Sequence, residues 1–331
     1  MVYLDPALFN NTNYKLALIF LYAFFATLIA TPYFIKKLIK LGYIVQDRYK
    51  IKKTMIPTMG GLAVLAGIMI SLALSTIFFI KETNTGELFI FYFVIIVYAM
   101  YGIVDDLFAF KQRYDKIITL LVLSLHIGVL VTHDSVNILG WSIFLGDWIP
   151  YLLAPVYVMV VANLLNVHSG FNGQSAGLGL IILLTVTIKS FMVNGLNHLF
   201  VILPILGAYI AFTPFTFYPA KILEGNVGQF MVGAAIGGFL IINNLSIFGI
   251  IILIPHIVNF ILDTWVLAIR KIPDVKFGSV RRDGTIIAPE RTRFKSIKYI
   301  LTYYLRLKEK DAVYIIYGIT IVFCIIGVVF F

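Results

Sequence analysis

The stretch VVANLLNVHSGFNG, residues 160–173, decides how this chain is to be understood. An apolar run is interrupted there by three amides (Asn163, Asn166 and Asn172), a histidine, a serine and two glycines. A lipid bilayer offers such groups no hydrogen-bonding partner, so the stretch must end at water or line a protein cavity. Polar groups in that position indicate a functional site. The stretch therefore predicts a membrane helix that ends at a site, to which other loops on the same side of the membrane contribute.

The composition of the whole chain indicates a membrane protein. Of 331 residues, 60% are hydrophobic and only 13% are charged, and the mean hydropathy is +0.96. Soluble domains are typically about a quarter charged. The net charge of +10 does not indicate nucleic acid as a partner, because the basic residues lie between apolar runs, where they orient the chain and meet anionic lipid heads. The single cysteine, Cys324, excludes an internal disulfide and a cysteine metal site.

Ten apolar runs are candidates to cross a bilayer, which takes roughly 17–25 residues of helix. They cover residues 16–35, 59–80, 88–104, 117–131, 149–165, 176–192, 199–217, 230–242, 247–269 and 313–331. The fourth and the eighth are the shortest. The sequence therefore predicts an all-α membrane protein of about ten transmembrane helices that forms a single domain over residues 1–331.

The distribution of lysine and arginine predicts the orientation. The connections after the first, third, seventh and ninth runs hold 23 of the 26 basic residues, whereas the opposite side keeps only Lys15, Lys81 and Lys189. Because basic connections stay in the cytoplasm, these four are expected there, with both termini outside. The connection that contains residues 166–173 falls on the cytoplasmic side as well. The ninth connection, residues 271–311, is expected to form a basic cytoplasmic loop.

An acidic pair, Asp105-Asp106, closes the third run. Adjacent carboxylates repel each other, and their charge at a membrane boundary is costly unless a cation neutralises it. A solvated helix end is the plain alternative, but acids at a helix C-terminus face the unfavourable end of the helix dipole. We therefore favour a functional pair. Lys111, Arg113 and Lys116 follow, and they are placed either to pair with the acids or to hold a phosphate.

The opening stretch supplies amides. Asn163 and Asn166, three residues apart, share a helix face, and Gly170-Phe171-Asn172-Gly173 is typical of a turn that exposes backbone and amide donors. Two plainer interpretations remain open. Asn166 ties two helices together in the first, and His168 is a packing or capping residue in the second.

Two further segments are rich in glycine or arginine. Glu224-Gly225-Asn226-Val227-Gly228 precedes an expected helix start, which is typical of an anion or metal-diphosphate site, or of an ordinary glycine-rich turn. Arginines suit planar phosphate recognition, but a solvated basic hairpin on lipid heads fits the ninth connection almost equally well. Its four candidate arginines are Arg281, Arg282, Arg291 and Arg293.

Four segments in this order resemble the polyprenyl-phosphate N-acetylhexosamine-1-phosphate transferase family, glycosyltransferase family 4. They are residues 56–61, Asp105-Asp106, residues 163–173 and residues 218–228. The amide-rich loop is most similar to the eukaryotic and archaeal branch that acts on dolichyl phosphate, and the chain lacks the histidine cluster of the bacterial muramyl-pentapeptide branch.

This resemblance implies a ten-span enzyme of the cell membrane. It would transfer N-acetylglucosamine 1-phosphate from UDP-N-acetylglucosamine to dolichyl or another polyprenyl phosphate and release UMP. The cofactor would be Mg²⁺, with Mn²⁺ as an alternative, and a homodimer is a possible assembly. The step would belong to early N-glycan or surface glycoconjugate assembly.

The resemblance also implies roles for single residues. Asp105 and Asp106 match the reaction centre, and Lys116 matches the lysine that holds the acceptor phosphate, one position off the usual spacing. Asn166 and Asn226 match metal ligands. The nucleotide-sugar side is matched by Asp47, Thr58, Asn163, Asn172 at the uracil, and the four arginines of the ninth connection.

Asn226 is the main departure, because the family usually has an aspartate there as a second metal ligand. A neutral amide oxygen remains a possible magnesium ligand where carboxylates and substrate phosphates supply charge. The departure also keeps open a non-catalytic homologue that binds the nucleotide-sugar or the lipid phosphate. A secondary transporter is the other alternative, although transporters usually place their polar residues near the middle of the membrane.

Overall fold

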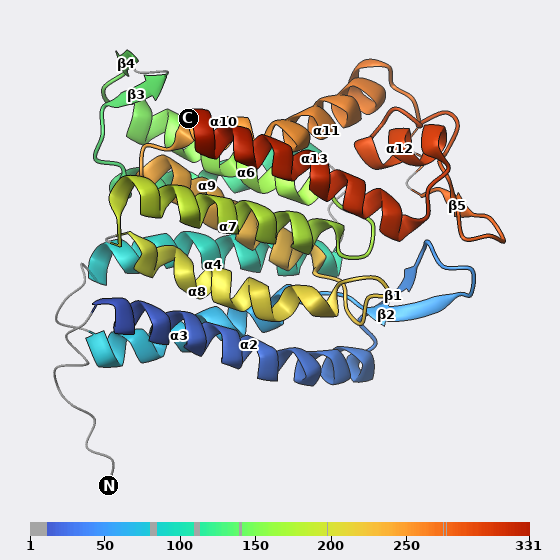
Figure 1. The fold of residues 1–331 in the computed structure, drawn as a ribbon, viewed down its shortest axis with the longest axis horizontal. Coiled ribbons are helices and arrows are strands. Elements are labelled where there is room, and N and C mark those ends of the chain that lie inside the picture. The colour runs from blue at the N-terminus through green and yellow to red at the C-terminus, as the bar shows by residue number, and fades with distance from the viewer. Residues whose placement is uncertain are drawn as a thin grey trace, which may run out of the picture.

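The computed structural model describes residues 12–79, 85–108, 113–138, 141–196, 198–273, 275 and 277–331. Lys111, one of the basic residues after the acidic pair, lies outside them. The described chain is mostly helical, as predicted, and its long helices lie side by side (Figure 1). The main helices are α2 (Thr12–Leu41), α3 (Gly61–Phe79), α4 (Thr85–Phe108), α5 (Arg113–Ser124), α6 (Ala154–Val167), α7 (Gln174–Asn194), α8 (Leu199–Phe212), α9 (Gly225–Ile242), α10 (Ser246–Ile252), α11 (Ile254–Thr264), α12 (Ile297–Leu305) and α13 (Glu309–Phe330). Short 3-10 or π turns extend α5 at Leu125–Leu130, α6 at Ile149–Leu153, α8 at Thr213–Phe215 and α11 at Trp265–Ile269.

Every predicted run falls on a helical segment, and the run of residues 247–269 covers two helices, α10 and α11. Among the described residues, six helices are long and apolar enough to cross a membrane, and there are seven such spans if α10 and the helix after it, bent by 67°, count as one broken span. The other three predicted spans fall on the shorter apolar helices Gly61–Ser75, Lys116–Leu130 and Leu199–Phe215. A membrane protein is therefore supported, and the number ten stays a prediction.

In the part of the chain that the structure describes, three short antiparallel hairpins depart from the all-α prediction. They are β1 (Ile44–Asp47) with β2 (Thr54–Pro57), β3 (Ser135–Ile138) with β4 (Trp141–Phe144), and β5 (Ser279–Val280) with β6 (Ile286–Ile287). All three lie in connections between helices. Figure 1 shows β1, β2 and β5 at one end of the bundle, and β3 and β4 at the other.

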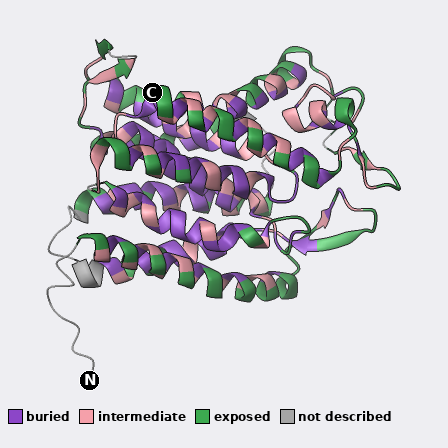
Figure 2. Cartoon of the chain, viewed as in Figure 1, coloured by how far each residue is buried: buried purple, intermediate pink, exposed green. Residues whose placement is uncertain are grey.

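Buried positions fill the interior of the bundle, while its outward faces are exposed (Figure 2). Several of the outward side chains are large and apolar, such as Ile29, 74% exposed, and Val129, 73% exposed. Such a surface is costly in water but suits contact with lipid chains. The burial pattern therefore agrees with the membrane prediction.

Helix α9 is the central helix, and α3 and α4 approach it closely. A methyl group at Gly61 in α3 would lie 2.3 Å from the backbone nitrogen of Gly228, and one at Gly102 in α4 would lie 2.4 Å from the Cα atom of Val227. No side chain fits at those distances. The two glycines thus let α3 and α4 bring their polar ends to the first turn of α9.

A second, smaller hydrophobic core lies apart from the core of the bundle. It consists of Tyr49, Phe171, Ile286, Ala288, Tyr299, Ala312 and Val313. Its members come from the connection after α2, the loop after α6, and the segment from β6 to the start of α13. This satellite core therefore joins three connections that the charge pattern predicted to lie on one side of the membrane.

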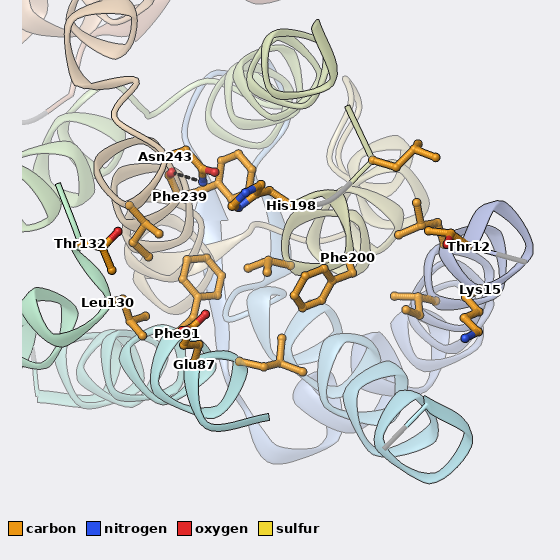
Figure 3. A pocket seen from close by; sticks show the side chains of 16 residues that line it. Thr12, Lys15, Glu87, Phe91, Leu130, Thr132, His198, Phe200, Phe239 and Asn243 are labelled. Atoms are coloured by element: carbon orange, nitrogen blue, oxygen red, sulfur yellow. Dashed lines mark hydrogen bonds between the residues drawn. The ribbon is translucent and has the colours of Figure 1, made fainter. Parts of the chain in front are cut away.

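A cavity of about 540 Å³ lies among the starts of α2, α4 and α8 and the end of α9 (Figure 3). Phe91, Phe200 and Phe239 form part of its wall, together with polar Lys15 and His198. None of the predicted site residues lines it. The site must be sought at the opposite ends of α4 and α9.

Candidate active site

A pocket of about 240 Å³ lies where the predicted polar loops meet. Thr58 from the turn after β2, Asp106 from the end of α4 and Asn226 from the start of α9 line it. Gly170 and Phe171 add the loop between α6 and α7. The structure thus brings together side chains from four of the predicted cytoplasmic connections.

Asp105 is a buried carboxylate that accepts hydrogen bonds from Lys116 and Asn226. Its Oδ2 atom accepts a hydrogen bond from Lys116 Nζ at 2.7 Å and another from Asn226 Nδ2 at 2.9 Å. Its side chain is 1% exposed, whereas that of Lys116 is 25% exposed. Lys116 therefore neutralises the buried acid and still reaches the surface. This is the pairing alternative that the sequence left open.

Asp106 serves as an N-terminal cap for α9, although it belongs to another helix. Its Oδ1 accepts a hydrogen bond from the backbone N–H of Asn226 at 3.0 Å, and its Oδ2 accepts one from that of Val227 at 3.3 Å. A carboxylate is stabilised at this positive end of a helix. Gly225, with a φ of 75°, leaves room for it, because a methyl group there would lie 2.7 Å from Asp106 Oδ2. The N–H groups that the sequence offered to an anion are thus bound by a carboxylate of the protein itself.

The two predicted metal ligands are in direct contact. Asn166 Nδ2 donates to Asn226 Oδ1 at 2.8 Å and also to Gln229 Oε1 at 2.8 Å. Asn166 ends α6, whereas Asn226 and Gln229 begin α9. The structure therefore supports the helix-tying interpretation of Asn166, and it also places both amides beside the acidic pair.

The donor set around the pocket can be compared with what a magnesium ion requires. Magnesium takes oxygen ligands and is usually held by one or two carboxylates together with substrate phosphates and water. Asp106, Glu224, Asn226 and Gln229 line the pocket with carboxylate and amide oxygens. Among the described residues no three His, Cys, Asp or Glu side chains form a metal-binding group. These residues fit a magnesium ion that shares its coordination with a substrate, and they do not form a closed protein cage.

Glu224 is a buried acid beside the pocket. Its Oε2 accepts a hydrogen bond from Ser175 Oγ at 2.6 Å, and its Oε1 accepts one from the Tyr209 hydroxyl. Burial raises the pKa of Glu224 to about 7, and these two hydrogen bonds oppose that rise. The carboxyl can therefore change its protonation near neutral pH.

Asn172 and Asp47 meet in a second polar cluster. Asn172 Nδ2 donates to Asp47 Oδ1 at 3.3 Å, and Asn172 Oδ1 accepts from the backbone N–H of Ala220 at 3.0 Å. Lys50 pairs with both Asp47 and Glu309. The sequence predicted that this turn exposes its amide, but Asn172 is only 4% exposed and its side chain is bound within the protein. Its match to a uracil-contacting residue stays a prediction.

Sequence reasoning missed Lys50 and Glu309. Lys50 appeared as one of many basic residues, and Glu309 stands 259 positions further along the chain. The signal that existed was weak, because Glu309 is one of two acids, with Asp311, that open the last apolar segment at the predicted cytoplasmic boundary. Only the folded chain shows that it faces Asp47 and Lys50.

Asn163 and the four arginines are not brought to the pocket. Asn163 donates to the carbonyl of Met159 in its own helix at 2.8 Å. The guanidinium of Arg293 lies 4.9 Å from the centre of the Tyr303 ring. The other three, Arg281, Arg282 and Arg291, are exposed, and none of the four lines the pocket. The structure thus agrees better with the solvated basic loop than with a diphosphate clamp.

His168 supports the packing interpretation. It follows the last residue of α6, is 1% exposed, and packs edge-to-face on His256 with ring centres 4.6 Å apart. Burial, and secondly the neighbouring His256, hold the pKa of His168 well below its usual value. The ring is therefore neutral near pH 7, and it does not line the pocket.

Known proteins match most of this chain. The sequence pattern of glycosyl transferase family 4 matches residues 88–244, which run from α4 to the segment after α9 and include Asp105, Lys116, Asn166 and Asn226. The predicted family resemblance is confirmed. The segment of this chain that matches the family thus contains both the acidic pair and the two amides that contact each other.

Three similar proteins come from archaea and a bacterium. A protein of Sulfolobus acidocaldarius, provisionally named UDP-N-acetylglucosamine–dolichyl-phosphate N-acetylglucosaminephosphotransferase, is 28% identical over 93% of this chain and 93% of its own length. One of Saccharolobus solfataricus with the same name is 27% identical over 93% of this chain and 94% of its own. A Bacillus subtilis protein, provisionally named undecaprenyl-phosphate N-acetylglucosaminyl 1-phosphate transferase, is 27% identical over 78% of this chain and 72% of its own.

Proposed function

We propose that this protein transfers N-acetylglucosamine 1-phosphate from UDP-N-acetylglucosamine to dolichyl or another polyprenyl phosphate. The products are the lipid diphosphate sugar and UMP. The observation that carries the proposal is the Asp105–Lys116 pair beside Asn226, at the meeting point of four loops, in a chain whose archaeal and bacterial relatives bear the names of such enzymes.

The reaction joins two phosphates. An oxygen of the lipid phosphate attacks the phosphorus that bears the sugar, a new P–O bond forms, and the bond to UMP breaks. The protein needs mainly to position these groups and to offset their charge. Lys116, partly exposed beside Asp105, supplies a cation for the acceptor phosphate, which would bring that phosphate next to the acid. Asp105 would then take the acceptor's proton in a direct attack. In the alternative, a carboxylate oxygen of Asp105 or Asp106 would attack the phosphorus first and release UMP, and the lipid phosphate would then displace that carboxylate.

Magnesium is the proposed cofactor, with manganese as an alternative. Asn166 and Asn226, with the acids beside them, would hold the ion, which when bound offsets the negative charge of the diphosphate. The support is that Asp106, Glu224 and Asn226 line the pocket, and that Asn166, which does not line it, contacts Asn226. The protein's own part is to orient the two amides, which α6 and α9 bring within hydrogen-bonding distance of each other.

An apolar groove beside Lys116 supports a lipid acceptor. It has a volume of about 370 Å³ and is lined by Val97, Met100, Tyr101, Val104, Thr119 and Leu123 in addition to Lys116. Aliphatic and aromatic walls suit a hydrocarbon chain, and the lysine suits its phosphate. The polyprenyl chain would therefore lie along α4 and α5 with its phosphate at Lys116.

The proposed setting is the cell membrane, crossed ten times by a single domain, residues 1–331. Both termini would lie outside and the site on the cytoplasmic face, where a water-soluble donor meets the lipid headgroups. Its support is the distribution of basic residues and the gathering of the polar connections at one end of the bundle. A homodimer would be tested by the mass of the purified protein in detergent.

Release of UMP tests the function. The purified protein is given UDP-N-acetylglucosamine, with and without dolichyl phosphate and with and without magnesium. Release that requires both additions is the expected result. No release with several UDP-sugars and lipid phosphates, while the sugar nucleotide still binds, would point to the non-catalytic homologue. Uptake of a solute into vesicles without any UMP would instead favour a transporter.

A further inference from the structure

Three side chains near the C-terminus hold the loop between α6 and α7. Lys298 Nζ donates to the carbonyl of Ser169 at 2.6 Å, and Glu309 Oε1 accepts from the backbone N–H of Asn172 at 2.7 Å. The Tyr317 hydroxyl donates to the carbonyl of Gly173. A cation and a hydroxyl thus meet carbonyl oxygens, and a carboxylate meets an N–H group.

Two glycines of this region leave space for two of these side chains, Lys298 and Tyr317. A methyl group at Gly170 would lie 2.1 Å from Lys298 Nζ, and one at Gly177 would lie 1.9 Å from the Tyr317 hydroxyl oxygen. Gly177 lies inside α7, where alanine would otherwise be favoured over glycine. Its presence is therefore explained by the approach of Tyr317.

The loop that is held in this way forms part of the pocket wall. Ser169, Gly170, Phe171 and Gly173 all line the pocket. The Phe171 ring packs edge-to-face on Tyr49, with ring centres 4.8 Å apart, inside the satellite core. The position of this wall thus depends on α12 and α13, which themselves contribute no residue to the pocket.

We propose that Lys298, Glu309 and Tyr317 are positioning residues that fix the backbone of residues 169–173 and thereby set the affinity of the pocket for its nucleotide-sugar. The role in affinity rests on the proposed function; the role in fixing the loop does not. None of the three needs to touch the substrate. Loss of one contact should loosen the loop and weaken binding while the chemical step is largely kept.

Hydrogen–deuterium exchange of the purified protein without nucleotide tests the first half. Tyr317→Phe and Lys298→Met should accelerate exchange of a peptide that covers residues 166–175. Tyr314→Phe, an exposed tyrosine in the same helix, is the matched control and should match the wild type. Gly177→Ala should reproduce Tyr317→Phe, because the added methyl group displaces the hydroxyl. Unchanged exchange in both Tyr317→Phe and Lys298→Met would overturn the proposal that these side chains fix the loop.

Binding and turnover of UDP-N-acetylglucosamine test the second half. The KM and the Kd should rise roughly three- to tenfold in Tyr317→Phe and Lys298→Met, as expected for one lost hydrogen bond, with kcat within about twofold. Faster exchange with unchanged affinity would overturn the link to the nucleotide-sugar. If the wild-type protein binds no UDP-sugar, the proposed function fails, and the exchange comparison still decides whether the loop is held.

Discussion

One carboxylate oxygen of Asp105 accepts two hydrogen bonds, since Lys116 and Asn226 both donate to its Oδ2 atom. Asp105→Asn and Lys116→Met should each lower UMP release by roughly a hundredfold or more, a loss typical of removed acid–base or charge-stabilising groups. Because the two side chains act as a pair, the double variant should be little worse than either single one. UMP release is measured for the wild type, the two single variants and the double variant, which together form a double-mutant cycle. Losses that simply multiply would show that the two residues act separately.

Asn226→Asp probes the proposed metal. The change replaces an amide that donates to Asp105 by a second carboxylate, and like charges at that distance repel. Without magnesium the midpoint of thermal unfolding should fall by several degrees, about the effect of 1–2 kcal/mol. Millimolar magnesium should restore most of it. Asn163→Asp, which lies off the pocket, is the control and should show no magnesium effect; an equal response in both variants would argue against coordination at Asn226.

Glu224 gives the protein a pH-dependent stability. Burial raises its pKa from an ordinary value of 4.5 to about 7, so the folded state keeps a proton that the unfolded state has lost. This contribution is complete below pH 4.5 and is lost as the pH rises to about 7, amounting to roughly 3 kcal/mol. Relative to Glu224→Gln, the wild-type protein should therefore lose stability across that window. A difference in unfolding midpoint between the wild type and Glu224→Gln that stays constant from pH 4.5 to 8 would contradict this expectation.

At the scale of residues, short-range patterns were visible in the sequence and long-range pairs were not. Asp105, Asp106, Asn166 and Asn226 stand out because polar groups at the ends of apolar runs are unusual. Glu309 does not, because its partners lie in other connections and ordinary charged residues surround it. The four arginines of the ninth connection do not line the pocket, and composition does not tell which loop residues turn toward it; their match to substrate-binding residues stays a prediction.

At the scale of elements, the close packing of α4 on α9 sets the distance between the acidic pair and Asn226. Gly102→Ala should push the two helices apart and lower both the unfolding midpoint and UMP release, because the added methyl group meets the backbone of α9. Gly318→Ala in α13 is the matched control, as nothing lies within 4 Å of its added methyl group. It should be neutral or slightly stabilising. Equal effects of the two changes on both measurements would contradict this account.

Hydropathy locates the helices but not their ends. Helix α2 continues past the predicted run to Leu41, since Lys36, Lys37 and Lys40 end a membrane run without ending a helix. Helix α9 begins at Gly225, earlier than the predicted run at residue 230, because Asp106 from α4 caps its first turn. Such a cap from a distant helix leaves no local pattern. The hairpins were missed for a related reason, since they are short and lie in polar connections.

At the scale of the whole molecule, the predicted orientation can be measured directly. In a Cys324→Ala background, a single cysteine at exposed Lys52 should react with a membrane-impermeant maleimide only after the cell membrane is opened. A cysteine at exposed Ser142, at the other end of the bundle, should react in intact cells. The reverse labelling pattern would show that the orientation is opposite to the predicted one. Labelling of both in intact cells would contradict the odd number of crossings, three, that is predicted between the two positions.

The satellite core also has a consequence for how the protein is made. Five of its seven members, from Ile286 to Val313, leave the ribosome after α9 is complete. Until then Tyr49 and Phe171 have only each other as partners in that core, and the loop after α6 lacks Lys298, Glu309 and Tyr317. The pocket wall can therefore be finished only when the last helix has been synthesised, so a nascent or C-terminally truncated chain would sit in the membrane with its main bundle formed and with residues 169–173 not yet held in place.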